Sequence, residues 1–179
     1  MPFRLAKKKK TLKAIIGLDL STSTGWALRD RLGTISSGVQ KFELARGDSV
    51  GMRFLRFRKW LLDKIQCVAG DGTTQYYTNA VDLIAVERAH HRGGAATALC
   101  VGLSTVVLEE AARLNIETTY VHTATLKKFL TGNGRASKEE MIQEATSRFS
   151  KKHLQGRIIG DDEADALGIL EWARLEIGE

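Results

Sequence analysis

The sequence predicts an α/β fold in which a mixed β-sheet carries helices on both faces. Three short apolar runs joined by polar turns predict an antiparallel meander of strands. These strands are expected over 13–20, 25–29 and 33–43. A nearly continuous apolar run over 81–87 predicts a further strand that is buried on both faces, as in parallel sheets. Segments with a helical spacing of apolar residues separate and follow the strands.

The first strand carries one acidic side chain, Asp19, inside its apolar run. Burying an unpaired carboxylate costs on the order of several kcal/mol. A divalent cation or a nearby base would stabilise this charge. The alternative is a turn in which Asp19 is a capping residue beside Ser21 and Thr22.

A basic amphipathic helix is predicted over 49–68, followed by a polar loop over 69–79. Apolar residues recur at near-helical spacing from Met52 to Ile65, with arginines and a lysine among them. These basic side chains form either a solvated face or a nucleic-acid surface, and the solvated face is the commoner outcome.

The buried strand over 81–87 ends on a second carboxylate, Glu87. Open α/β sheets place their chemistry at the carboxyl ends of such strands, whereas an ion pair with Arg88 or Arg92 is the structural alternative. The next helix, over 92–114, is rich in small residues and suits close packing on the sheet or a dimer interface. A strand over 116–121 follows it.

A short helix over 125–130 leads into a glycine-rich loop and then a helix that begins near Ser137. Ser137 and Glu140 have the spacing of a capping box. The loop lacks the spacing of a P-loop, and a plain helix–helix connection is the alternative to a phosphate site. Four basic side chains around it suit phosphate contact: Lys127, Lys128, Arg135 and Lys138.

The final helix, over 160–176, opens with four acids in five residues: Asp161, Asp162, Glu163 and Asp165. A helix N-terminus favours each negative charge by about 0.3–1 kcal/mol, which explains one or two of them. Helical spacing places Asp162 and Asp165 on one face, where like charges repel. A bound metal ion accounts for this arrangement.

The composition favours a polyanionic partner. Lysine and arginine outnumber aspartate and glutamate by 27 to 21, and a basic arm over 1–13 contributes part of this excess, as a solvated tail or as a phosphate contact. Cys67 and Cys100 lie far apart and read as reduced thiols. With no signal-peptide pattern and no long apolar segment, we expect a cytoplasmic protein without membrane contact.

Four carboxylates form the candidate metal site: Asp19, Glu87, Asp162 and Asp165. Hard oxygen ligands on rigid elements suit Mg²⁺ or Mn²⁺. Two such ions close together would activate water and stabilise the leaving oxygen in phosphodiester hydrolysis.

The order of these elements resembles the RNase H-like nuclease superfamily, and in particular RuvC-type Holliday junction resolvases. The resemblance extends from Ile15 to Trp172 and rests on an ordered set of motifs rather than on one of them. The matching segments are Ile16-Gly17-Leu18-Asp19 with Gly25-Trp26, Ile84-Ala85-Val86-Glu87, the helix from Gly94 to Gly102, the lysine-bearing segment from Leu126 to Lys138, and Asp162-Glu163-Ala164-Asp165-Ala166-Leu167.

This resemblance implies an RNase H-like sheet and a single nuclease domain over 14–179. It implies a metal-dependent, structure-selective endonuclease that acts as a homodimer on branched DNA, with two Mg²⁺ or Mn²⁺ ions per site. The four acids become metal ligands, Lys138 stabilises charge on the scissile phosphate, and Lys127 holds DNA. The basic arm suits a phage or mobile-element member.

The sequence departs from the family pattern at two places. Leu20-Ser21 stands where the family commonly has Pro-Gly. His90 stands where an aromatic residue disturbs bases at the junction centre in the family, so His90 is a candidate DNA contact, as is Arg92 two residues later. An exposed loop histidine is the alternative.

Two other functions are consistent with parts of the sequence. An ATPase of the actin and Hsp70 class has a similar first strand, but its two lobes need far more chain. A non-catalytic RNase H-like module that binds branched DNA would have lost at least one acid, and all four are present.

Overall fold

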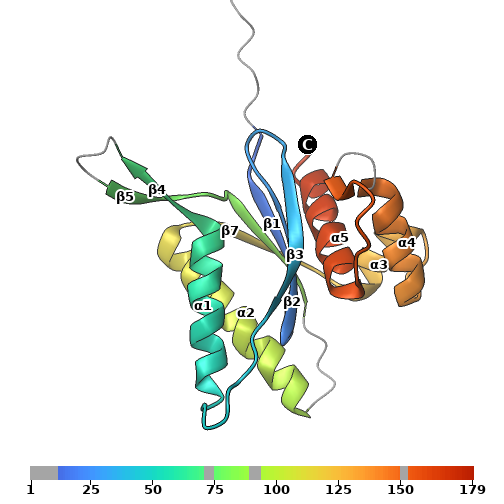
Figure 1. The fold of residues 1–179 in the computed structure, drawn as a ribbon. Helices are drawn as coiled ribbons and strands as arrows, with labels where there is room; N and C mark the ends of the chain where they lie inside the picture. Colours follow the sequence, from blue (N-terminus) through green and yellow to red (C-terminus); the bar gives the residue numbers. More distant parts are fainter. Residues whose placement is uncertain (1–11, 71–74, 89–93, 150–152) are drawn as a thin grey trace, which may run out of the picture.

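The computed structural model describes residues 12–70, 75–88, 94–149 and 153–179. A five-stranded sheet lies between two layers of helices (Figure 1). In spatial order its strands are β3 (Ile35–Lys41), β2 (Ser23–Arg29), β1 (Ile15–Asp19), β6 (Leu83–Glu87) and β7 (Glu117–Val121). The helices are α1 (Gly51–Ile65), α2 (Gly94–Leu114), α3 (Thr123–Thr131), α4 (Lys138–Phe149) and α5 (Asp161–Glu176). A separate hairpin consists of β4 (Gln66–Gly70) and β5 (Gln75–Asn79).

The sheet is mixed. β1, β2 and β3 form an antiparallel meander, whereas β6 pairs in parallel with both β1 and β7. In the turn between β2 and β3, Gly33 has a φ of 86°, which glycine adopts at little cost. This topology confirms the predicted meander and the predicted parallel strand.

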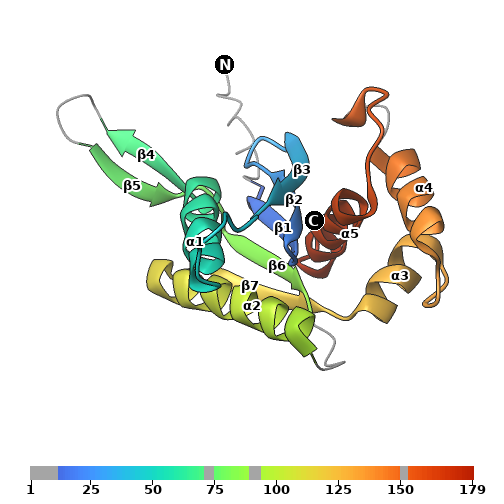
Figure 2. The same cartoon turned by 60° about the horizontal axis from the view of Figure 1, so that its bottom comes forward.

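Alternate residues of β1 face the two helical layers. Ile16 and Leu18 belong to a buried cluster with Phe57 of α1 and Val107 of α2. Ile15 belongs to a second cluster, which α3, α4 and α5 complete. Figure 2 shows α1 and α2 on one side of the sheet and the other three helices on the opposite side. Helices on both faces, as predicted, are therefore confirmed.

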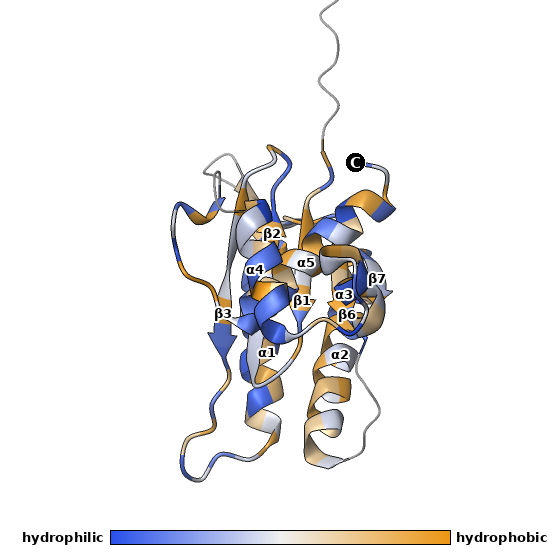
Figure 3. Ribbon diagram, turned by 90° about the vertical axis from the view of Figure 1, so that its right-hand side faces the viewer, coloured by the Kyte–Doolittle hydropathy of each residue, from blue (hydrophilic) through white to orange (hydrophobic). Residues whose placement is uncertain are grey.

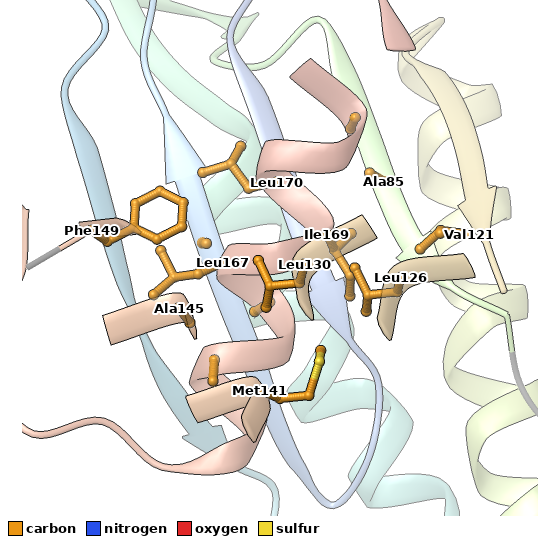
Figure 4. Packing of buried hydrophobic residues seen from close by; sticks show 14 of the residues in the cluster. Ala85, Val121, Leu126, Leu130, Met141, Ala145, Phe149, Leu167, Ile169 and Leu170 are labelled. Carbon is orange, nitrogen blue, oxygen red and sulfur yellow. The ribbon is translucent and has the colours of Figure 1, made fainter. Parts of the chain in front are cut away.

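The second cluster joins three helices to the sheet. Side chains of all three meet in it, including Leu130 of α3, Met141 of α4 and Leu167 of α5 (Figure 4). The predicted capping box at the start of α4 is present: the Ser137 N–H donates to Glu140 at 2.6 Å, and the Glu140 N–H donates to the Ser137 hydroxyl at 3.2 Å. The capping box therefore fixes where α4 begins, and the apolar side chains of the cluster pack α4 against α5.

The helix α2 is apolar along most of its length (Figure 3). This helix is long and apolar enough to cross a membrane, but the core helices of soluble proteins can have the same length and composition. Leu103 and Val106 lie in the cluster shared with α1. A Cβ atom at Gly102 would come within 2.5 Å of the Phe54 ring, so α1 and α2 are in close contact there.

The segment over 66–79 differs from the prediction of a helix end and a loop. α1 ends at Ile65 because Gln66 takes up an extended backbone conformation. Cys67 and Val68 continue the apolar spacing of the helix, but they pair with Thr78 and Tyr77 of β5. The result is a hairpin that extends away from the helices and the sheet (Figures 1 and 2).

Arginines of α1 contact other parts of the protein. Arg56 forms an ion pair with Asp48 at 2.7 Å. Arg58 reaches across to α2, where it lies 3.2 Å from Glu110 and also pairs with Glu109. These contacts favour the structural interpretation of this basic face over the nucleic-acid surface.

Some predicted features lie outside the described residues. The basic arm over 1–13 is described only at Leu12 and Lys13. The candidate DNA contacts His90 and Arg92 also fall in an interval that is not described.

Candidate active site

Two neighbouring parallel strands end in carboxylates, Asp19 on β1 and Glu87 on β6. The strands pair in register, so both acids lie at the same edge of the sheet. Side chains at two-residue spacing share a face. Gly17 lies against α5, and Ala85 belongs to the cluster that includes α5. Asp19 and Glu87 therefore face α5 as well.

Two glycines allow the α5 backbone to approach the sheet directly. A Cβ atom at Gly17 would lie 2.7 Å from the Ala166 carbonyl oxygen. At Gly25, which is the β2 partner of Asp19, a Cβ atom would lie only 1.8 Å from the Asp162 carbonyl oxygen. Only glycine permits these approaches. They bring the acidic first turn of α5 next to the end of β1.

The charges of the four predicted acids interact across this site. Burial raises the pKa of Asp19 well above its usual value, and the negative charges of Glu87, Asp165 and Asp162 raise it further. Burial also raises the pKa of Asp165 to about 7, again with a contribution from Glu87. If Asp19 only capped the turn, there would be no reason for three other acids to lie close enough to raise its pKa.

The turn after β1 is held by residues other than Asp19. The Thr24 hydroxyl donates to the Ser21 carbonyl at 2.8 Å, and the Ser23 N–H donates to the Ser21 hydroxyl at 3.0 Å. The turn thus has its own side-chain caps. The carboxylate of Asp19 is left for the site at the sheet edge.

Known solved structures with this architecture include Holliday junction resolvases. RuvC of Thermus thermophilus in complex with a Holliday junction substrate matches with a TM-score of 0.67 and 18% identity over 92% of this chain and 96% of that one. A second T. thermophilus RuvC structure matches with a TM-score of 0.62 and 18% identity over 91% and 96%. The chain has the RuvC fold.

A viral protein has the same overall arrangement. The fowlpox virus Holliday junction resolvase matches with a TM-score of 0.55 and 10% identity, over 91% of this chain and 99% of that one. No protein-family model and no curated protein matches the chain in sequence. The chain therefore shares the RuvC fold at a sequence identity of 18%.

Within the RuvC fold, two lysines border the acids in different ways. Lys138 is exposed and forms an ion pair with Asp161, whose pKa this contact lowers. The Lys127 ammonium donates to the Ala136 carbonyl at 2.5 Å, and its positive charge acts on Asp165. Lys127 therefore lies in the wall of the site, whereas Lys138 lies at its rim.

The other predicted phosphate contacts lie on the same flank of the RuvC fold. Lys128 of α3 and Arg135 in the loop before α4 are both exposed. The Asn133 side chain accepts a hydrogen bond from the Arg135 N–H at 3.0 Å, which orders the loop. The structure therefore brings all four basic residues to the α3–α4 side of the acids.

Within the described residues, Glu87 bonds to a threonine and not to Arg88, while the other alternative partner, Arg92, lies outside the described residues. Arg88 contacts His122 at 3.3 Å, and the carboxylate of Glu87 accepts a hydrogen bond from the Thr123 hydroxyl. Thr123 is the first residue of α3 and follows the end of β7, the strand beside β6. This contact orients Glu87 toward the sheet edge.

Three residues near the acids do not emerge from the sequence analysis. Thr123 bonds to Glu87, Ser23 bonds to Asp162, and Lys41 acts on the charge of Asp162 from the end of β3. Ser23 and Lys41 are partners in the β2–β3 register. A signal for Ser23 was present in the sequence, since it lies in the polar turn that follows Asp19.

The donor set suits a divalent cation. Asp19, Glu87, Asp162 and Asp165 supply carboxylate oxygens, which Mg²⁺ and Mn²⁺ prefer. Burial and neighbouring negative charges raise the pKa values of Asp19 and Asp165, and a cation would reverse that effect. Among the described residues, no three acid, histidine or cysteine side chains form a ready-made metal cluster. The support for a metal therefore comes from the carboxylate chemistry of the four acids and from the interaction between their negative charges.

Proposed function

We propose that the chain is a metal-dependent, structure-selective endonuclease that resolves Holliday junctions and related branched DNA. The observation that carries this proposal is the meeting of four acids from three elements at one edge of a RuvC-fold sheet. The pKa values of Asp19 and Asp165 are raised, so their ionised forms are disfavoured, and a bound divalent cation would stabilise those ionised forms. The proposal keeps the cytoplasmic location that we expect from the sequence.

Asp19, Glu87, Asp162 and Asp165 would hold two Mg²⁺ or Mn²⁺ ions. When bound, such ions activate a water molecule and stabilise the leaving oxygen of a phosphodiester. Thr123 orients Glu87, and Ser23 orients Asp162. The chain itself thus contributes the rigid carboxylate frame.

Lysine and arginine residues would hold the DNA backbone next to these acids. Lys138 would leave Asp161 to stabilise charge on the scissile phosphate, and Lys127 would hold the DNA beside Asp165. Lys128 and Arg135 contact phosphates on one side, and Lys41 does so on the other. His90 and Arg92 remain proposed contacts at the junction centre.

We further propose a homodimer, because two symmetric cuts in a four-way junction suit a two-fold symmetric protein. The interface would be on α2. Two apolar side chains of this helix, Val101 and Leu108, are exposed within one copy, at 41% and 45%. Leu108→Arg should convert the dimer to a monomer in light scattering over a range of concentrations.

The decisive experiment compares a labelled four-way junction, a flap and a linear duplex, each with Mg²⁺ and with chelator. Paired symmetric nicks in the junction, dependent on metal, support the proposal. Cutting of every branched form widens the substrate class. Tight junction binding without cutting in Mg²⁺ or Mn²⁺ identifies a non-catalytic binding module instead. Absence of junction binding overturns both the nuclease and the binding module.

A further inference from the structure

Glu163 lies between two proposed ligands in the sequence but has a different set of partners. Its side chain is buried, with the residue 4% exposed. The carboxylate accepts hydrogen bonds from the Arg157 guanidinium at 2.9 and 2.5 Å. It also accepts one from the Ser37 hydroxyl at 2.6 Å. Every oxygen of this buried acid therefore has a partner.

Ser37 links the group further. Its hydroxyl lies 2.7 Å from Nε2 of His153 and 3.3 Å from the Arg157 guanidinium. These four side chains come from β3, from the segment before α5 and from α5 itself. We call Ser37, His153, Arg157 and Glu163 the α5 clamp.

The clamp opposes a force that the site itself creates. Asp162 and Asp165 both lie on α5, and when they and Asp19 are ionised with no cation bound, their carboxylates repel one another. Repulsion would move the first turn of α5 away from β1. Within α5 the buried apolar residues begin at Ala164, which follows Asp162 and precedes Asp165, so the residues of the first turn need further contacts.

We propose that Glu163 is a positioning residue, which holds the first turn of α5 through Ser37 and Arg157 so that Asp162 and Asp165 are in place before the metal binds. This inference rests on the proposed function. It assigns a role to the one acid of the first turn that bonds neither to the site nor to Lys138. Groups that orient ligands typically change metal affinity or activity by about 10–100-fold when they are removed.

The test compares Glu163→Gln with Glu171→Gln. Glu171 lies on the same helix and also forms an ion pair, with Arg174 at 2.6 Å, but it lies more than a turn beyond the acids. Mn²⁺ affinity is measured by calorimetry without DNA, together with junction affinity in chelator and thermal unfolding.

Glu163→Gln should weaken Mn²⁺ binding by about tenfold or more, with junction affinity in chelator changed less than twofold. Glu171→Gln should leave Mn²⁺ affinity at the wild-type value. Ser37→Ala, which keeps the Arg157 ion pair and so the fold, should weaken Mn²⁺ binding in the same direction but by less. It serves as the test if Glu163→Gln fails to fold.

The outcomes separate the two proposals. If the wild type binds Mn²⁺ and cuts the junction while Glu163→Gln and Ser37→Ala bind Mn²⁺ as Glu171→Gln does, the positioning role is wrong and the nuclease stands. If the wild type itself neither binds Mn²⁺ nor cuts, the proposed function fails, and the role of Glu163 fails with it.

Discussion

At the scale of single residues, Asp19 is the acid on which the other charges converge. Burial and the carboxylates of Glu87, Asp165 and Asp162 all disfavour its ionised form. A carboxylate in this position destabilises the protein when no metal is bound, and it stabilises a cation that binds there. Asp19 is therefore a site at which stability and activity should respond in opposite directions to a substitution.

Asp19→Asn should abolish cleavage, because a ligand is lost, and should leave junction binding intact. In chelator the variant should also be more stable than the wild type, since asparagine removes the buried charge. A gain of about 1 kcal/mol corresponds to a rise in Tm of about 2–4 °C for a chain of this size. Calorimetric unfolding in chelator measures it, and a large fall in Tm would mean that Asp19 is a structural residue.

The raised pKa of Asp165 predicts a pH dependence of stability. The unfolded chain releases this proton near the usual value of 3.8, whereas the folded protein holds it up to about 7. Proton binding therefore stabilises the metal-free fold fully below about pH 4, and this contribution is lost as the pH rises to about 7. Denaturant unfolding in chelator should reveal this loss in the wild type.

Asp165→Asn is the control for this pH dependence. The difference in unfolding free energy between the two proteins should grow as the pH rises from 4 to 7, in favour of the variant. Excess Mg²⁺ should stabilise the wild type at pH 7 and above and leave the variant much less affected. Parallel pH profiles for the two proteins would contradict the assignment of this titration to Asp165.

The acids could be predicted from the sequence, but the groups that hold them could not. An unpaired carboxylate in an apolar run, as at Asp19, is visible along the chain. Ser37 and Glu163 are 126 residues apart, and Glu87 and Thr123 are 36 apart. Such partners meet only through the packing of elements, which the spacing of residues within one element does not describe.

At the scale of elements, α5 lies against bare strand backbone at Gly17 and Gly25. This contact sets the distance between the strand that carries Asp19 and the helix that carries Asp162. The meander, β6 and α5 could be predicted because their apolar runs are long and their ends are marked by turns or acids. The hairpin of β4 and β5 could not, because Cys67 and Val68 fit a continued helix equally well.

Gly25→Ala should damage both stability and cleavage. Its Cβ atom would overlap the Asp162 carbonyl oxygen at 1.8 Å, so α5 must move. Overpacking of this kind costs about 1–3 kcal/mol, and the ligand displacement should reduce cleavage further than the stability loss alone. Gly51→Ala is the control, since its Cβ atom would meet nothing closer than 3.6 Å. Equal effects of both variants would contradict this role of Gly25.

At the scale of the whole molecule, charge is distributed unevenly. Acids gather at the end of β1 and β6, whereas Lys127, Lys128, Arg135 and Lys138 lie on the α3–α4 flank. Arg56 and Arg58 of α1 form ion pairs with acids of the protein itself. Within the part of the chain that the structure describes, we therefore expect the α3–α4 flank to supply positive charge to DNA beside the proposed catalytic centre.

Replacing both Lys128 and Arg135 with alanine should reduce the salt dependence of junction binding. Each phosphate contact contributes about 0.9 to the slope of log affinity against log salt, so the slope should fall by about 2. Arg31→Ala is the control, because Arg31 lies at the opposite end of the sheet, paired with Asp82 at 2.7 Å. An unchanged slope in the double variant would exclude this flank as the DNA surface.

The placement of two of the four acids on α5 has a consequence for synthesis on the ribosome. A nascent chain that has emerged as far as Gly160 contains Asp19 and Glu87 but lacks Asp162 and Asp165. It also lacks the helix that covers Gly17 and Gly25. The proposed nuclease therefore stays inactive until α5 has been synthesised, and it acquires the means to cut DNA only when α5 packs on the sheet.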